Sequence, residues 1–278
     1  MRGLAIAMAG MALISPVRAA TLGETFSAYA KGATKTVDHA AWDGILKSHI
    51  RADATGLNRF DYATAKAKSH GKLKAYINAL QAVDIALLDR PEQFAFWVNL
   101  YNAKTIDVVL DHYPVSSIRN ISINEGLLGF FKKSAGYGGP WKAKILIVSG
   151  HKLSLDDVEH NILRAVFKDA RVHYAVNCAS IGCPNLSNTA FTGAKLDELL
   201  DAGARAYVNH PRGIAIADGK VTASSIYNWF QSDFGGNAAG VLAHVRKFAA
   251  PGLAAKLETV SEIGSYHYDW ALNDISKQ

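Results

Sequence analysis

The stretch 91-PEQFAFWVNLYNAKTIDVVLDHY-113 decides the fold of this chain. Pro91 fits the first turn of a helix, and Glu92 lies near the positive end of the helix dipole. The apolar residues that follow leave almost no polar face, which is typical of a buried helix. They are Phe94, Phe96, Trp97, Val98, Leu100, Tyr101, Ile106, Val108, Val109 and Leu110.

Two side-chain amides, Asn99 and Asn102, interrupt this apolar helix. They are three residues apart and therefore lie on one side of it. A buried amide without a partner costs roughly 1–3 kcal/mol, so we expect both amides to be hydrogen-bonded.

The rest of the chain predicts an α+β fold, with a helical N-terminal half and a small mixed or antiparallel sheet with packed helices. Further helices are predicted at 40–51, 72–88, 154–167, 194–209, 238–249 and from Ser224 or Ser225 onward. Strands are predicted at 144–148, 171–177 and 257–263, and an Asp-Gly turn predicts a hairpin over 213–222. No repeat or linker divides the chain, so residues 20–278 are predicted to form one globular domain.

Residues 1–19 have the composition of an export signal. Arg2 precedes an uncharged apolar run, and Val17 and Ala19 fit the small-x-small pattern before a cleavage point. An uncut N-terminal anchor is the alternative, although the run is short for a bilayer span. We expect a periplasmic or extracellular protein without a transmembrane segment in its mature chain.

The distribution of charge indicates which class of partner the protein binds. The net charge of +6 becomes +4 when the signal with Arg2 and Arg18 is removed. The basic residues are scattered, which argues against a nucleic-acid partner. A peptide, a glycan or a small molecule is the expected ligand. The chain has no GxSxG, HExxH, Walker loop or strand-linked GxGxxG, and no cofactor is predicted.

Helix 154–167 carries one group of candidate site residues. Glu159 falls within its core-facing stripe, where a carboxylate needs a partner or a raised pKa. His160 and Arg164 lie one turn apart on the flank of the same helix.

The stretch 171-RVHYAVNCASIGCPNL-186 holds both cysteines of the chain, Cys178 and Cys183. If 171–177 is a strand, strict alternation sends His173 and Cys178 to opposite faces. Gly182 then helps to force a loop.

Three interpretations of these residues stay open. In the first, Cys178 is a nucleophile, His173 or His160 is its base, and a third group orients the imidazole. In the second, His160, His173, Glu159 and Cys178 bind a metal such as zinc. In the third they are structural: Cys178 and Cys183 form a disulfide or stay as buried thiols, His173 is a core residue, and Glu159 pairs with Arg164 or with backbone amides.

Aromatic residues near the C-terminus are expected in the core rather than in a ligand platform. They are Tyr227, Trp229, Phe230, Phe234, Tyr266, Tyr268 and Trp270. The segment 232-SDFGG-236 predicts a helix that stops at a glycine pair.

Six motifs, in order from about Val83 to Asp274, together resemble the domain of unknown function 547 family. They are FAFWVNLYNAKTIDVVLDHYP, KLSLDDVEHNILR, RVHYAVNCASIGCPNL, AYVNHPRG, SSIYNWFQSDFGG and YHYDWALND. The activity of that family is not established. The resemblance implies an exported protein and places several polar residues in recurrent motifs: Asn99, Tyr101, Asn102, Glu159, His160, Arg164, His173, Cys178, Cys183 and Pro184.

By looser analogy, a buried helix followed by a His-bearing strand is similar to papain- and transglutaminase-like folds. Those folds place a cysteine at the start of the central helix, whereas here that helix offers Asn99 and Asn102.

The leading hypothesis is a thiol- or His/Glu-dependent amide hydrolase or transferase. Cys178 would attack a carbonyl, His173 would shuttle the proton, and Glu159 or Asn102 would orient the imidazole or stabilise the oxyanion. The alternatives are a non-catalytic envelope module that binds a peptide or glycan in the same groove, and a metal-binding protein. Further candidates are His160 for catalysis and Asn99, Tyr101, Arg164 and Ser180 for binding.

Overall fold

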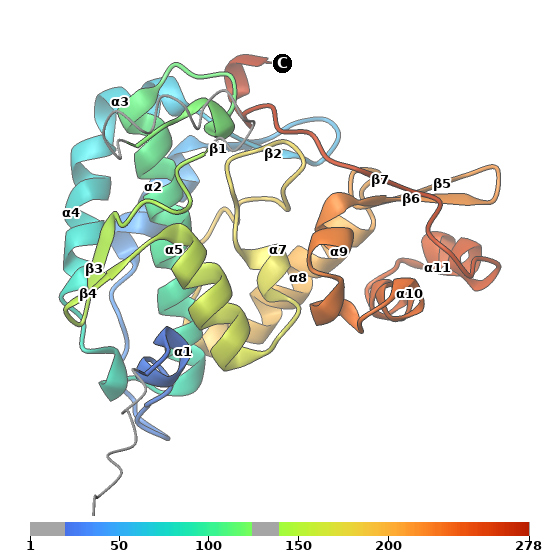
Figure 1. Cartoon of the computed structure of the whole chain (residues 1–278). Coiled ribbons are helices and arrows are strands. Elements are labelled where there is room, and N and C mark those ends of the chain that lie inside the picture. Colours follow the sequence, from blue (N-terminus) through green and yellow to red (C-terminus); the bar gives the residue numbers. More distant parts are fainter. Residues whose placement is uncertain (1–19, 124–138, 278) are drawn as a thin grey trace, which may run out of the picture.

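Helix α5 (Arg90–His112) lies at the centre of the computed structural model, which describes residues 20–123 and 139–277 (Figure 1). The Asp89 carboxylate accepts a hydrogen bond from the N–H of Arg90 at the start of the helix, and Pro91 occupies its first turn. Most of its residues are buried, so the predicted buried helix is confirmed. The predicted export signal lies outside the described residues.

The elements before α5 are mostly helical, as predicted, and they include one hairpin. Strands β1 (Ile50–Ala52) and β2 (Asn58–Phe60) pair antiparallel, with Arg51 opposite Arg59. The sequence assigned residues 50 and 51 to the end of a helix, so this hairpin was missed. The remaining elements are α1 (Leu22–Thr25), α2 (Ala40–His49), α3 (Tyr62–Lys68), α4 (His70–Gln81) and the 3-10 turn η1 (Ile85–Leu87).

The segment after α5 carries a hairpin and a π-helix. The 3-10 turn η2 (Ile118–Asn120) precedes β3 (Leu146–Val148), which pairs antiparallel with β4 (His151–Leu153). Ser154 and Asp157 exchange side-chain to backbone hydrogen bonds and so form a capping box at the start of the predicted helix 154–167. The helix that follows, η3 (Asp157–Phe167), has π geometry, a form found frequently at functional sites.

The C-terminal part contains the predicted small mixed sheet (Figure 1). Strand β6 (Lys220–Ser224) pairs antiparallel with β5 (Ile214–Ala217) and parallel with β7 (Ser265–His267). Ser224 caps α9 (Ser225–Trp229), as predicted. The other elements are α7 (Val172–Ala175), η4 (Gly193–Lys195), α8 (Leu196–Val208), η5 (Gln231–Phe234), α10 (Ala238–Arg246), α11 (Pro251–Glu258) and η6 (Ile275–Lys277). The α+β prediction is confirmed.

Two predicted strands are wrong. Residues 171–177 form the single helical turn α7 and then an extended segment, and residues 257–263 belong to the end of α11 and a following turn. In both stretches the β-rich composition is overridden by tertiary contacts. The argument that alternation separates His173 from Cys178 therefore no longer applies.

Buried apolar side chains form two clusters, and α7 contributes to both. Val172 and Ala175 belong to the cluster around α5, whereas Tyr174 belongs to the cluster formed by α8, the C-terminal sheet and the helices after it. The loop that carries the cysteines begins directly after α7 and so lies where the two clusters meet. Within 20–123 and 139–277, no helix combines the length and the apolar composition needed to cross a bilayer.

Both amides on α5 make paired hydrogen bonds to backbone groups, as expected. Asn99 donates to the carbonyl of Phe191 at 2.8 Å and accepts from the N–H of Phe191 at 3.0 Å. Asn102 donates to the carbonyl of Ala175 at 2.9 Å and accepts from the N–H of Asn177 at 2.8 Å. The helix thereby fixes two loops, one of which holds the cysteines.

Replacing Asn102 by alanine is expected to lower the free energy of unfolding by about 2–3 kcal/mol, because a buried carbonyl and a buried N–H lose their partners. Urea denaturation measures this change. Asn78→Ala on the exposed face of α4 is the matched control and should change stability by about 0.5 kcal/mol or less. Equal effects of the two substitutions would contradict this account of Asn102.

Candidate functional site

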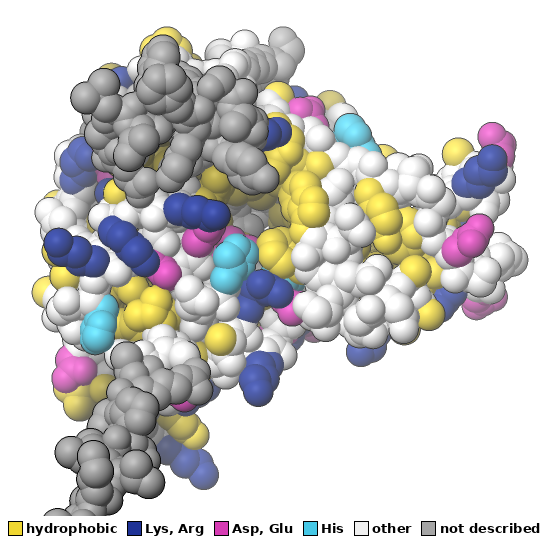
Figure 2. Space-filling view, in the orientation of Figure 1, with side chains coloured by type: hydrophobic (Ala, Val, Ile, Leu, Met, Phe, Trp, Pro, Cys, Tyr) yellow, Lys and Arg dark blue, Asp and Glu magenta, His cyan; other side chains and the backbone are white. Residues whose placement is uncertain are grey.

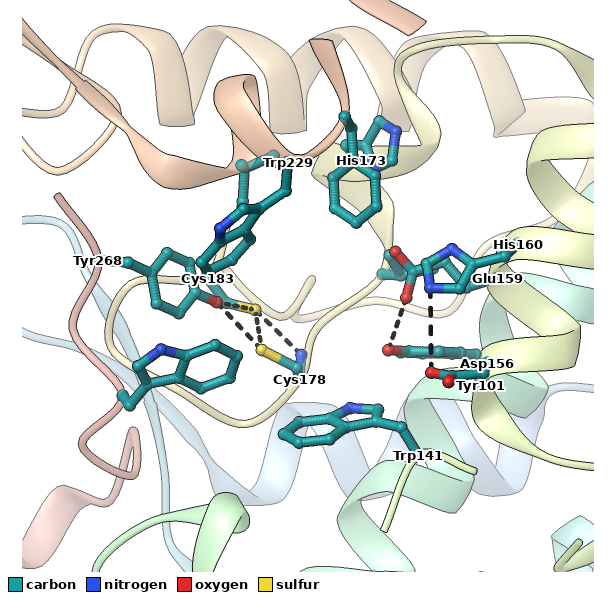
Figure 3. Close-up of a pocket in the computed structure, with 14 residues that line it drawn as sticks. Tyr101, Trp141, Asp156, Glu159, His160, His173, Cys178, Cys183, Trp229 and Tyr268 are labelled. Atoms are coloured by element: carbon teal, nitrogen blue, oxygen red, sulfur yellow. Dashed lines mark hydrogen bonds and ion pairs between the residues drawn. The ribbon is translucent and has the colours of Figure 1, made fainter. Parts of the chain in front are cut away.

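A cavity of about 170 Å³ lies between η3, the cysteine loop, α9 and the segment after β7 (Figure 3). Its lining combines sulfur, carboxylate, imidazole and aromatic groups. In Figure 2, hydrophobic side chains border a hollow near the middle of the face, with histidine and acidic side chains beside them. The lining residues are Tyr101, Trp141, Asp156, Glu159, His160, His173, Val176, Cys178, Cys183, Ile226, Trp229, Phe230, Tyr268 and Trp270.

The cysteine loop is held from both sides. Asn177, fixed by Asn102, donates to the carbonyl of Pro184 and accepts from the N–H of Ala179, which closes the loop on itself. Ala179 has a φ of 60°, in the left-handed region. Gly182 lies against the C-terminal segment, where a Cβ would come within 2.8 Å of the backbone nitrogen of Asp269. Glycine is therefore required at this close approach.

The two sulfur atoms lie at one wall of the cavity, 2.8 Å apart. Several donors surround them. The N–H of Cys178 donates to Cys183 Sγ at 3.0 Å, and the Tyr268 hydroxyl lies 3.2 Å from Cys183 Sγ and 3.1 Å from Cys178 Sγ. The Ser180 hydroxyl lies 3.2 Å from Cys178 Sγ. This cluster of Cys178, Cys183, Ser180 and Tyr268 is called the thiol cluster below.

Hydrogen bonding sets the protonation of the thiol cluster. Burial alone would raise the pKa of Cys183, but the bonds from the Cys178 thiol, the Tyr268 hydroxyl and the Cys178 N–H outweigh burial and lower this pKa to about 7. The pKa of Cys178 is raised well above its usual value, because its thiol is the donor to Cys183 and is itself buried. The two thiols titrate as a coupled pair, in which these hydrogen bonds favour deprotonation of Cys183 over that of Cys178.

Glu159 and its neighbours form the facing wall of the cavity (Figure 3). Its carboxylate accepts a hydrogen bond from the Tyr101 hydroxyl at 2.9 Å, so the structural interpretation, which gave Glu159 either Arg164 or backbone amides as partners, is wrong on this point. His160 Nε2 lies 3.9 Å from the Asp156 carboxylate, and Arg164 contacts His160 Nδ1 at 3.3 Å. Burial and the nearby charge of Glu159 raise the pKa of Asp156, against the opposing effect of His160.

His173 is engaged with an acid that the sequence did not single out. Its Nε2 lies 2.8 Å from the Asp233 carboxylate, which also forms a two-pronged ion pair with Arg164. Burial raises the pKa of Asp233, but His173 and Arg164 together hold it well below its usual range. The ring of His173 stacks on Phe230 at 4.2 Å between centroids.

The thiol–imidazole pair of the leading hypothesis is therefore not formed. Within the described residues, hydrogen bonds to the two sulfurs come from Ser180, Tyr268, the Cys178 N–H and the cysteines themselves, and none comes from a histidine. His173 Nε2 is bonded to Asp233, and among the described residues no hydrogen bond joins His173 to Cys178. His160, the other candidate base, lines the same cavity from the facing wall.

Aromatic side chains complete the cavity, and several of them were expected in the core. Trp229 is 46% exposed and stacks on Trp270 at 5.7 Å between centroids, and Tyr268 contacts both rings. Trp141 meets the edge of Trp270. Only part of the core prediction is confirmed, since Tyr227 and Phe234 are buried in the second cluster.

The disulfide and metal interpretations differ from what the structure shows. Both cysteines are free thiols, and their 2.8 Å separation is well beyond the 2.05 Å of a disulfide bond. The residues proposed as metal ligands do not converge on one point. Among the described residues, a grouping of metal-binding type occurs elsewhere, at His70, Asp107 and Asp111, where the ammonium of Lys74 already pairs with both carboxylates.

The structure places the other predicted residues in distinct positions. Tyr101, Glu159, His160, Cys178 and Cys183 meet at the cavity, and Ser180 supports the thiols. Three others stabilise the structure around the cavity instead. Asn99 and Asn102 bond to backbone groups, and Arg164 forms an ion pair with Asp233. Sequence reasoning missed Asp156, Trp141 and Asp233, and it assigned Trp229, Tyr268 and Trp270 to the core.

Comparison with known proteins identifies the region that carries most of these residues. The family model described as "Protein of unknown function, DUF547" matches residues 85–208, a range that includes both cysteines, Glu159 and His173. Trp229, Tyr268 and Trp270 lie beyond the match. No curated protein and no solved structure matches the chain. The match over residues 85–208 supports the predicted resemblance of this chain to the domain of unknown function 547 family.

Proposed function

We propose that the protein is an exported, thiolate-dependent amide hydrolase or acyl transferase, in which Cys183 is the nucleophile. One observation carries this proposal: the Cys178 thiol, the Cys178 N–H and the Tyr268 hydroxyl all converge on the Cys183 sulfur at the wall of a cavity. A thiolate, not a thiol, is the nucleophile in such reactions. Export is supported by the composition of residues 1–19.

In the proposed reaction cycle, the wall with the cysteines supplies the nucleophile and the facing wall supplies the acid and base. The Cys183 thiolate forms a bond to the carbonyl carbon, and the C–N bond breaks as the amine leaves with a proton from the imidazolium of His160. A water molecule or a second amine then attacks the thioester, neutral His160 accepts its proton, and the Cys183 thiolate is released. The Asp156 carboxylate lies 3.9 Å from His160 Nε2 on the same wall of the cavity.

Thiol–disulfide exchange is a second candidate, favoured by the 2.8 Å separation of Cys178 and Cys183. The Cys183 thiolate would attack a disulfide substrate and release one substrate thiolate. Cys178 would then attack the mixed disulfide, releasing the second thiol and leaving Cys178 and Cys183 joined until a reductant restores them. In this reaction both cysteines are needed, whereas acyl transfer needs Cys183 alone.

The rate of alkylation of Cys183 by iodoacetamide is expected to rise with pH around a midpoint of about 7, because its hydrogen bonds lower the pKa. An ordinary cysteine has a midpoint of roughly 8.5. Peptide mass spectrometry after brief labelling from pH 5 to 10, at roughly one-unit steps, measures both sites. Tyr268→Phe removes one donor and should move the midpoint upward. Labelling of Cys178 before Cys183 would contradict the assignment.

Incubation with p-nitrophenyl acetate is expected to leave one acetyl group on Cys183 and to release one p-nitrophenolate in the first turnover. Absorbance records the release, and intact-protein and peptide masses locate the acetyl group. Cys183→Ser should reduce the release to the background rate. Cys178→Ser keeps a hydroxyl and the backbone N–H as donors, and it should still be acetylated. Acetylation at an equal rate in Cys183→Ser would refute the acyl-transfer proposal.

Oxidised glutathione separates the two candidate functions. If exchange is the reaction, the wild-type chain will lose two hydrogens and release two glutathione molecules, while Cys178→Ser will stop at a mixed disulfide on Cys183. Intact mass under non-reducing conditions distinguishes these products. A wild-type chain that stays reduced while it accepts acetyl groups would leave acyl transfer as the sole candidate.

A further inference from the structure

We infer that the cavity takes a substrate with a cationic group, such as a lysine side chain or another alkylammonium, bound between the acidic wall and the tryptophans. This inference rests on the proposed function, because it assigns the substrate class of the same cavity. The acidic wall consists of Asp156 and Glu159, and the aromatic wall of Trp141, Trp229, Trp270 and Tyr268.

Within residues 20–123 and 139–277, the acidic groups of the cavity lining have few compensating partners. Glu159 is nine-tenths buried, its one hydrogen bond among the described residues comes from Tyr101, and it forms no ion pair there. The ion-pair partner of Asp156 in the same part of the chain is His160 at 3.9 Å, and Lys142 acts on Asp156 only at longer range. The Cys183 thiolate adds a further negative charge.

Two arginines near this site are already engaged. Arg164 pairs with Asp233 and lies over the ring of Phe230, and Arg119 lies over Trp270 at 5.2 Å. Burying a carboxylate such as that of Glu159 is costly unless a partner compensates the charge. An ammonium group supplied by the substrate would meet this requirement.

The aromatic wall suits a cation more than a neutral ligand. An ammonium over the face of a tryptophan gains roughly 0.5–2 kcal/mol, with the larger value in desolvated sites. Trp229 is partly exposed at the rim and Trp141 lies on the side of Asp156, whose N–H donates to the carbonyl of Trp141 at 3.0 Å. A neutral sugar would use the rings but leave both carboxylates without a counter-charge.

The orientation of a substrate bound in this way agrees with the proposed acyl transfer. With its ammonium at Glu159 and Asp156, an alkylammonium substrate extends across the cavity toward the sulfur of Cys183 on the facing wall (Figure 3). Depending on which end reacts, such a substrate is either an amide next to a lysine or an amine that accepts the acyl group.

Binding of Nα-acetyl-lysine methylamide to the full chain tests the inference. Two readouts measure binding: the quenching of tryptophan fluorescence and the protection of Cys183 from iodoacetamide. The neutral analogue, Nα-acetyl-norleucine methylamide, should bind at least about tenfold more weakly, as expected when a charged hydrogen bond is lost. Glu159→Gln and Asp156→Asn should each weaken the lysine ligand about tenfold or more and leave the norleucine ligand unchanged. Glu258→Gln, an identical change at an exposed position of α11, is the matched control and should alter neither.

The outcomes separate this inference from the proposed function. Cys183→Ser should still bind the lysine ligand, because the cation site does not include the sulfur. If the wild type binds the lysine ligand but is not acetylated, the acyl-transfer proposal is refuted and the cation site stands. Equal affinity for the lysine and norleucine ligands, or protection of Cys183 by an N-acetylglucosamine oligosaccharide but not by the lysine ligand, would overturn the inference while leaving the thiolate proposal intact.

Discussion

The buried amide of Asn102 is the interaction on which the site depends. It joins the central helix α5 to both ends of a short backbone segment, the carbonyl of Ala175 and the N–H of Asn177. Asn177 in turn closes the cysteine loop through Pro184 and Ala179. The positions of both sulfurs thus follow from a rigid helix through two amide side chains, and the two cysteines are not joined by a disulfide.

In the thiol cluster, hydrogen bonds from groups other than histidine lower the pKa of a buried cysteine. An imidazole lowers a thiol pKa by its charge, whereas here three neutral donors converge on Cys183 and outweigh the cost of burial. His173 lies near the same cavity but is held by Asp233 and Phe230, which fixes its ring in the wall. The catalytic arrangement proposed for this chain therefore differs from a papain-like Cys–His pair.

The sequence was sufficient for the α+β class, the buried helix α5 and the pairing of its amides, because each follows from local pattern and from the cost of an unpaired buried amide. It was not sufficient for α7, since Val172 to Val176 are β-prone and the Asn102 side chain that bonds to Ala175 and Asn177 comes from a helix more than 70 residues earlier in the chain. Asp233 could not be linked to His173, because 60 residues separate them and the fold brings them together. Trp229 and Trp270 look like core residues in sequence, and only the structure places them at a cavity.

The segment from Tyr268 to Asp274 has a consequence for the order in which the molecule is completed. Its backbone receives hydrogen bonds from Ile181 and Gly182 of the cysteine loop and from Phe60 of the N-terminal hairpin, and its Tyr268 supplies a donor to the sulfurs. A segment that begins 85 residues after Cys183 is therefore built into the middle of the molecule. Because Tyr268 follows both cysteines so far along the chain, the hydrogen bonds that lower the pKa of Cys183 are complete only after this segment has folded back onto the cysteine loop.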